Sequence, residues 1–157
     1  MKKVLIYGVG NPFRCDDVVG IKIIEELKKR INKSNITIKS GSIDGLSMLD
    51  EIHGYDKVLF VDSIKTQGGK PGAIYKIKLD PLKKTPSLSA SHGIDFVTAV
   101  RMGRKFGYKM PEKIYVYAVE IKDNDTFSEE CTEQVLASIP EVVKRIKREI
   151  DNDQSLH

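Results

Sequence analysis

The sequence predicts an α/β fold, a single three-layer α/β/α domain with a five-stranded, mostly parallel and twisted sheet. Apolar residues recur with a period of two in some segments and about 3.6 in others, which is typical of βαβ units. Residues 57–62 are apolar almost throughout, as in a central strand buried on both faces. With 157 residues and no repeat or linker, we expect one domain at 1–150 and a frayed polar tail at 151–157.

The first half of the chain carries three predicted strands and two helices. From Val19 to Ile31 apolar residues recur at helical spacing, and charged residues occupy the opposite side. Asp16 or Asp17 can cap this helix, because a short acidic side chain accepts bonds from free backbone amides. The predicted elements are a strand at 3–7, a helix at 18–31, a strand at 36–39, a helix at 46–52 and a strand at 57–62.

The second half begins with a Gly-rich loop at 65–72, whose glycines and proline disfavour regular structure. Alternating apolar residues then predict strands at 73–79 and 113–121. Phe96, Val97 and Val100 indicate a helix at about 93–106. A last helix should begin near residue 132, break at Pro140 and continue to 150.

Composition narrows the range of partners. The 26 basic residues against 22 acidic ones give a net charge of +4, but the lysines are spread out, so we expect no nucleic-acid partner. No run approaches the roughly 18 apolar residues that span a bilayer, and the apolar N-terminal segment is too short for a signal peptide. Only Cys15 and Cys131 occur, which fits a reducing compartment. We therefore expect a cytoplasmic protein without membrane contact, and a monomer.

Three residues distant in sequence are candidates for one site. Asp17 follows the first strand, Asp62 closes the third, and His92 opens a helix. In an open α/β sheet the carboxyl ends of the strands and the following helix starts form one crevice, so the three side chains can converge. Two carboxylates and one imidazole suit a borderline divalent metal.

Each candidate also has a plainer interpretation. Asp17 can be a helix cap, and His92 can be an ordinary residue at a helix start. Asp62 is harder to explain without function, because a carboxylate on an apolar central strand is costly to desolvate and needs a partner or a cation.

Other motifs give weaker signals. Gly8 and Gly10 resemble the start of a dinucleotide-binding turn, but the third glycine is replaced by Phe13, so a tight turn and a direct ligand contact remain equal alternatives. Cys15 stands beside two aspartates, which disfavour the reactive thiolate. His53 should lie on the surface. The sequence has no His-Glu-x-x-His zinc motif and no Gly-x-Ser-x-Gly elbow.

Taken together, these motifs resemble those of the endopeptidases that mature the large subunit of nickel-iron hydrogenases. The resemblance extends over about residues 4–121 and implies the same five-stranded α/β fold. The residues that carry it are Gly8-Val9-Gly10-Asn11, Asp16-Asp17, Gly20, Val61-Asp62, Pro71-Gly72-Ala73 and Ser91-His92.

The resemblance implies a role for each candidate. Asp17, Asp62 and His92 match the family's three ligand positions, and the metal would be nickel that belongs to the substrate. The implied substrate is a nickel-loaded hydrogenase large-subunit precursor, which loses a C-terminal extension.

One segment departs from the family pattern. Where many members have Asp-Gly-Gly-Thr-x-Gly, this chain has Ser40 in place of the aspartate, followed by Gly41, Asp44 and Gly45. We expect Gly41, Asp44 and Gly45 to contribute to substrate binding, with Asp44 replacing the missing carboxylate.

Two rival functions remain open at this point. The same three residues would serve a non-catalytic metal- or nucleotide-binding module. They would also serve a hydrolase with its own zinc, because two acids, one histidine and a water complete a tetrahedral site.

Overall fold

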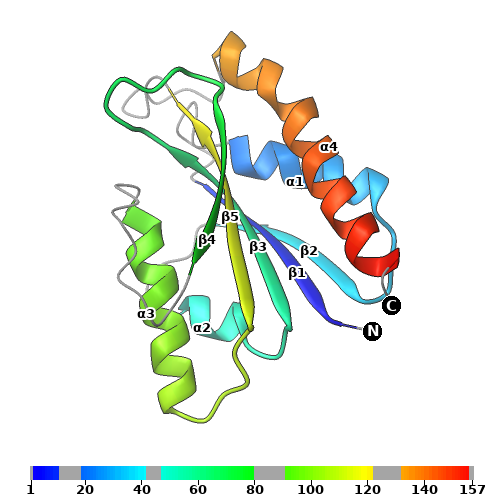
Figure 1. The fold of residues 1–157 in the computed structure, drawn as a ribbon, viewed down its shortest axis with the longest axis vertical. Coiled ribbons are helices and arrows are strands. Elements are labelled where there is room, and N and C mark those ends of the chain that lie inside the picture. Colours follow the sequence, from blue (N-terminus) through cyan, green and yellow to red (C-terminus); the bar gives the residue numbers. More distant parts are fainter. Residues whose placement is uncertain (1, 11–18, 42–46, 80–90, 122–131, 156–157) are drawn as a thin grey trace.

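The structure is a computed structural model that describes residues 2–10, 19–41, 47–79, 91–121 and 132–155, with the backbone alone at 91–97 and 154–155. Figure 1 shows the arrangement of the elements. In chain order they are β1 (Val4–Val9), α1 (Val19–Arg30), β2 (Ile36–Gly41), α2 (Ser47–Ile52), β3 (Lys57–Ile64), β4 (Ile74–Leu79), α3 (Ser91–Lys105), β5 (Lys113–Glu120) and α4 (Glu133–Ser155).

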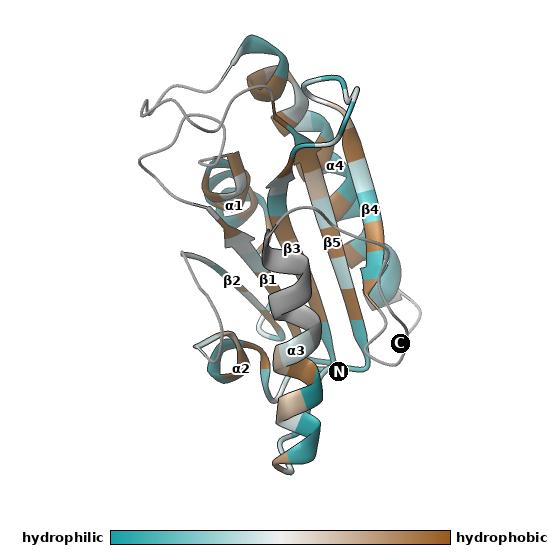
Figure 2. Ribbon diagram, turned by 90° about the vertical axis from the view of Figure 1, so that its left-hand side faces the viewer, coloured by the Kyte–Doolittle hydropathy of each residue, from teal (hydrophilic) through white to brown (hydrophobic). Residues whose placement is uncertain are grey.

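The five strands form one sheet in the order β2-β1-β3-β5-β4. All neighbours pair in parallel except β4, which runs antiparallel to β5 at the edge of the sheet. Seven of the eight residues of β3 are buried, as a central strand covered on both faces requires. The central strands β1, β3 and β5 are accordingly rich in hydrophobic residues (Figure 2). The predicted mostly parallel, five-stranded sheet is confirmed.

Helices cover both faces of the sheet and complete the three predicted layers. α1 and α4 pack on one face, around a core that contains Ile6, Leu59 and Ile146. α2 and α3 pack on the other face, around Tyr7, Phe60 and Val100. No helix in the described part of the chain is both long and apolar enough to cross a bilayer.

The third strand and the last helix are longer than the sequence predicts. β3 continues past Asp62 to Ile64, because Ser63 and Ile64 pair with β5. α4 runs without interruption through Pro140 and on to Ser155, so neither the predicted break nor a frayed segment at 151–155 is present.

Packing explains the continuity of α4. A proline inside a helix costs about 3 kcal/mol, but α4 buries an apolar stripe against α1 and the sheet on both sides of Pro140. Its polar end is held by ion pairs, since Lys33 lies 3.2 Å from Asp151 and Lys57 contacts Asp153.

Candidate active site

Asp62 lies near the carboxyl edge of the sheet, the edge at which the parallel strands end. It is inside β3 rather than at its last residue, and it stands opposite Ala118 of β5. The residue is only 3% exposed, and its Oδ1 accepts a hydrogen bond of 2.8 Å from the backbone N–H of Ser63. Side chains alternate along a strand, so Asp62 faces the same side as Phe60 and Ile64, the side that α2 and α3 cover.

Two glycines bring the start of α1 against this edge. A Cβ on Gly20 would lie 2.8 Å from the carbonyl oxygens of both Val9 and Val61. A Cβ on Gly8 would lie 2.4 Å from Ile24 Cγ1. The absence of side chains at both positions therefore lets the first turn of α1 rest on the ends of β1 and β3, which favours packing over ligand contact as the role of Gly8.

The helices next to the two predicted partners of Asp62, α1 and α3, lie on opposite faces of the sheet. Asp17 lies outside the described residues, but α1 begins two residues later, against the carbonyl of Val61 next to Asp62. His92 is in the first turn of α3, and its side chain is not described. α3 runs away from the carboxyl edge, so its first turn is the end nearest to that edge (Figures 1 and 2).

The predicted substrate-binding residues are only partly described. Gly41 ends β2, and a Cβ there would lie 2.7 Å from the hydroxyl of Tyr7. Burial first, and then the charge of Glu51, raise the pKa of Tyr7, so its hydroxyl stays neutral beside Gly41. Asp44 and Gly45 lie outside the described residues, as does Cys15, whereas His53 is exposed as predicted.

Glu120 is a residue of this edge that the sequence analysis missed. It ends β5, is 1% exposed, and accepts hydrogen bonds from Thr66 and Tyr75. The signal in the sequence was a glutamate between Val119 and Ile121 in a strand that is otherwise apolar near its end.

Among the described side chains, no three His, Cys, Asp or Glu residues come together as a metal site. Asp62 is the described member of the predicted three. A carboxylate near the carboxyl edge of a parallel sheet can ligate a cation or accept a proton from water, and these are the two chemistries expected of Asp62.

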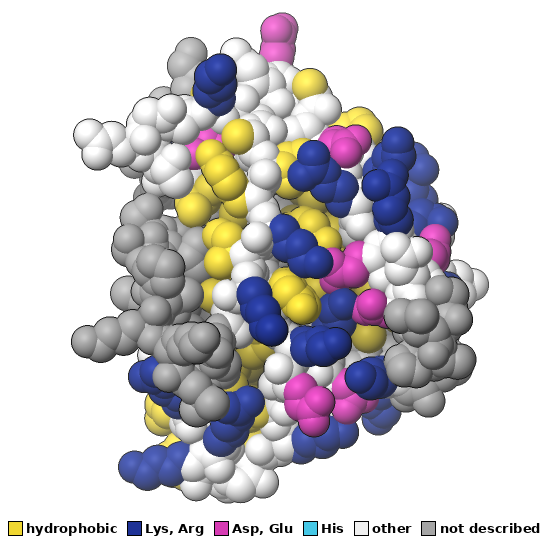
Figure 3. Space-filling view, viewed as in Figure 1, with side chains coloured by type: hydrophobic (Ala, Val, Ile, Leu, Met, Phe, Trp, Pro, Cys, Tyr) yellow, Lys and Arg dark blue, Asp and Glu magenta, His cyan; other side chains and the backbone are white. Residues whose placement is uncertain are grey.

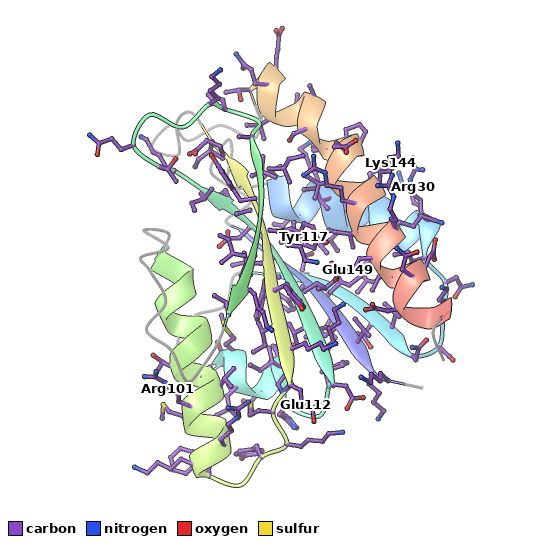
Figure 4. All side chains as sticks on the ribbon, in the orientation of Figure 1. Arg30, Arg101, Glu112, Tyr117, Lys144 and Glu149 are labelled. Atoms are coloured by element: carbon purple, nitrogen blue, oxygen red, sulfur yellow. The ribbon has the colours of Figure 1, made fainter. Side chains whose placement is uncertain are left out.

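A separate groove runs between α1 and α4, away from Asp62. Its lining includes Arg30, Leu136, Pro140 and Lys144, and Figure 4 labels Arg30 and Lys144 along it. It contains none of the predicted site residues. On the face shown in Figure 3, basic and acidic side chains are interspersed rather than gathered by sign.

Comparison with known sequences identifies relatives along nearly the whole chain. The family model described as hydrogenase maturation protease matches residues 21–149, a range that includes Asp62 and His92 and begins after Asp17. The hydrogenase 2 maturation protease of Escherichia coli (strain K12) is 27% identical over 163 residues, covering 96% of this chain and 99% of the relative. The hydrogenase expression/formation protein HupD of Rhizobium leguminosarum bv. viciae is 23% identical, covering 93% and 73%.

Solved structures show the same fold. The hydrogenase maturating endopeptidase HybD from E. coli aligns with a TM-score of 0.81 at 20% identity, over 96% of this chain and 93% of that one. The [NiFe] hydrogenase maturation protease HycI from Thermococcus kodakarensis KOD1 aligns with a TM-score of 0.72 at 24% identity, over 92% and 90%. Since the family model covers most of the sequence, the chain belongs to the hydrogenase maturation protease family and is an endopeptidase.

Proposed function

We propose that this endopeptidase removes a C-terminal extension from a hydrogenase large-subunit precursor that already holds nickel. Asp17, Asp62 and His92 complete the coordination of the substrate's nickel and so recognise a loaded precursor. The supporting observation is the buried carboxylate of Asp62 at the carboxyl edge of the sheet, where the starts of α1 and α3 also lie.

The donor chemistry suits that role. Carboxylate oxygens and an imidazole nitrogen are acceptable ligands for nickel, but three such ligands without a thiolate hold a free ion weakly against competitors. The same three ligands can complete a coordination sphere that the precursor has already begun. Nickel is therefore part of the substrate in this proposal, and selectivity comes from the metal.

Burial of Asp62 also bears on the hydrolytic step. Peptide hydrolysis needs a group that takes a proton from the attacking water, and a carboxylate held by the Ser63 N–H is fixed in position for this. Asp17 is the second carboxylate that can act in this way.

The cellular setting is part of the same proposal. We infer a cytoplasmic enzyme, since the two cysteines of the chain fit a reducing compartment. A monomer is consistent with the described surface, where the exposed large hydrophobic side chains are Phe106, Tyr108 and Leu136.

The test compares two forms of one precursor. Purified, metal-free protein is incubated with a nickel-loaded large-subunit precursor and with the same precursor lacking nickel, and the C-terminal mass is read by mass spectrometry. We expect cleavage of the loaded form alone. Equal cleavage of both forms would rule out nickel as the recognition element.

Metal analysis separates this proposal from a hydrolase with its own zinc. We expect the purified protein to hold less than stoichiometric metal, because its three ligands bind a free ion weakly. One tightly held zinc per chain, with activity lost on chelation and restored by zinc, would favour the zinc hydrolase instead.

A further inference from the structure

Glu120 is a buried carboxylate near the site that the proposed chemistry does not use. Its Oε2 accepts a hydrogen bond of 2.7 Å from the backbone N–H of Thr66. Its Oε1 accepts one of 2.5 Å from the Thr66 hydroxyl and one of 3.2 Å from the Tyr75 hydroxyl. A carboxylate that is 1% exposed needs such donors to offset its desolvation, so their placement is a defined feature of the fold.

The backbone of Glu120 holds the far end of the same connection. Its carbonyl accepts a hydrogen bond of 2.8 Å from Gly72, and its N–H donates one of 2.8 Å to the carbonyl of Ala73. One residue of β5 therefore fixes both ends of the segment 65–73, which links β3 to β4.

The middle of the segment is fitted to the same carboxylate. A Cβ on Gly69 would lie 1.9 Å from Glu120 Oε1, so a side chain at this position would displace the Glu120 carboxylate from its donors. The Gly69 N–H also donates to the Thr66 carbonyl at 3.2 Å, which closes a turn inside the loop. The loop is thus shaped around Glu120 rather than left to adapt.

This loop lies beside the candidate active site. Ile64 pairs with Glu120 and Asp62 pairs with Ala118, so Asp62 and Glu120 stand two residues apart on adjacent strands. Both face the side of the sheet that α2 and α3 cover, because side chains alternate along a strand. The loop continues directly from β3, and its exposed residues are Lys65, Gln67, Gly68 and Lys70.

We propose that Glu120 is a positioning residue that holds loop 65–73 as a preformed docking rim for the precursor next to Asp62. This inference rests on the proposed function, because it assigns the loop to the same protein substrate. The exposed lysines and glutamine on the rim suit a polypeptide segment with acidic or polar side chains. A loop held in its bound shape binds more tightly, since less ordering is needed on association.

Three substitutions test the role of Glu120 without changing the predicted metal ligands. Glu120→Gln keeps the size of the side chain but removes the negative charge that strengthens the hydrogen bonds from Thr66 and Tyr75. Thr66→Val removes one donor, and Thr66→Ser restores it. We expect the first two to raise KM for the nickel-loaded precursor about tenfold with kcat within about twofold, and Thr66→Ser to behave as wild type.

A matched control separates docking from general stability. Glu149 is a second carboxylate held by side-chain donors, with its side chain 12% exposed, but it lies on the opposite face of the sheet and accepts a hydrogen bond of 2.6 Å from the Tyr117 hydroxyl. Glu149→Gln should lower the denaturation midpoint and leave KM unchanged. In the absence of precursor, hydrogen exchange at the amides of Thr66, Gly69 and Gly72 should be faster than in wild type in Glu120→Gln, and unchanged in Glu149→Gln.

Three results would overturn the proposal. The first is that the loop amides of Glu120→Gln exchange at the wild-type rate. The second is that Glu120→Gln lowers kcat and leaves KM unchanged. The third is that Glu149→Gln raises KM as much as Glu120→Gln does. If Glu120→Gln does not fold, the same measurements on Thr66→Val and Thr66→Ser replace it. If the wild-type protein leaves the loaded precursor uncut, the proposed function fails, whereas exchange of the free loop still tells whether Glu120 orders it.

Discussion

Two properties of Asp62 together indicate a catalytic role. It is a carboxylate on a strand with apolar neighbours, and it lies near the carboxyl edge of the sheet. A purely structural role would be met at lower cost by an apolar residue, because desolvating a carboxylate is unfavourable. The side chain is therefore expected to contribute more to catalysis than to stability.

The isosteric substitution Asp62→Asn tests this expectation. Asparagine retains an oxygen that can accept the Ser63 N–H, so the free energy of unfolding should change by no more than about 1 kcal/mol. Loss of the charged ligand or base should lower the cleavage rate about 100-fold or more. We expect the same loss of processing, measured by the C-terminal mass of the precursor, for Asp17→Asn and His92→Ala.

Asp50→Asn on α2 is the matched control, because Asp50 is exposed and should tolerate the change with full activity. Near-wild-type cleavage by two of the three site variants would contradict the site assignment.

Sequence reasoning finds some residues of this edge and misses others for a physical reason. Asp62 is visible because it interrupts an apolar run that is readable locally. Glu120 also interrupts an apolar strand, but its role cannot be read locally, because its donors Thr66 and Tyr75 are 54 and 45 residues away and only the pairing of β3, β4 and β5 brings them together.

At the scale of elements, the sequence predicts all the described helices and strands because their apolar periods are local properties. The ends of elements depend on partners. β3 extends to Ile64 because β5 offers it a pairing partner, and α4 passes Pro140 because its buried stripe outweighs one lost hydrogen bond. The residues that make these contacts lie elsewhere in the chain, so the sequence of the segment alone does not predict where it ends.

Glu149 fastens α4 to the sheet and gives that element a pH dependence. It accepts a hydrogen bond from Tyr117, pairs with Lys57 at 2.8 Å and contacts Lys76; Figure 4 shows Tyr117 and Glu149 pointing toward one another. Burial acts to raise the pKa of Glu149, but the hydrogen bonds from Lys57, Lys76 and Tyr117 outweigh it, so the pKa lies below its ordinary 4.5.

The lowered pKa of Glu149 makes the protein less stable at acidic pH. A carboxyl group whose pKa is lowered by folding stabilises the protein fully above its unfolded pKa, and this contribution is lost as the pH falls through the folded pKa. We expect Glu149→Gln to cost about 3 kcal/mol of unfolding free energy at pH 7, because it leaves buried Lys57 short of a partner. The difference from wild type should shrink below pH 4.5.

Urea denaturation at several pH values measures this difference. Glu141→Gln on the same helix is the control, since its pair with Arg145 is about half exposed and should contribute less than about 1 kcal/mol. A difference that stays constant from pH 7 to pH 3 would show that Glu149 stabilises the protein by packing alone.

At the scale of the whole molecule, the two ends of the sheet have different tasks. The carboxyl edge carries Asp62, the starts of α1 and α3, and loop 65–73. The opposite edge carries the connections at 53–56 and 106–112, which are tied to each other by backbone bonds such as that from Gly54 to Lys109. The eight residues of β3 separate these edges by about 26 Å.

This separation makes the docking face testable in one experiment. A precursor that reaches Asp62 must cover the carboxyl edge. The opposite edge of the sheet, about 26 Å from the carboxyl edge, lies beyond the contacts that position a scissile bond. On addition of nickel-loaded precursor, hydrogen exchange should slow at residues 65–73, and at 40–45, which we expect from the sequence to bind substrate. Exchange at 53–56 and 106–112 should stay as in the free protein, and those segments are the internal control. Protection confined to α4 would instead place the precursor on the groove between α1 and α4, and the carboxyl edge would then lose its assignment as the docking face.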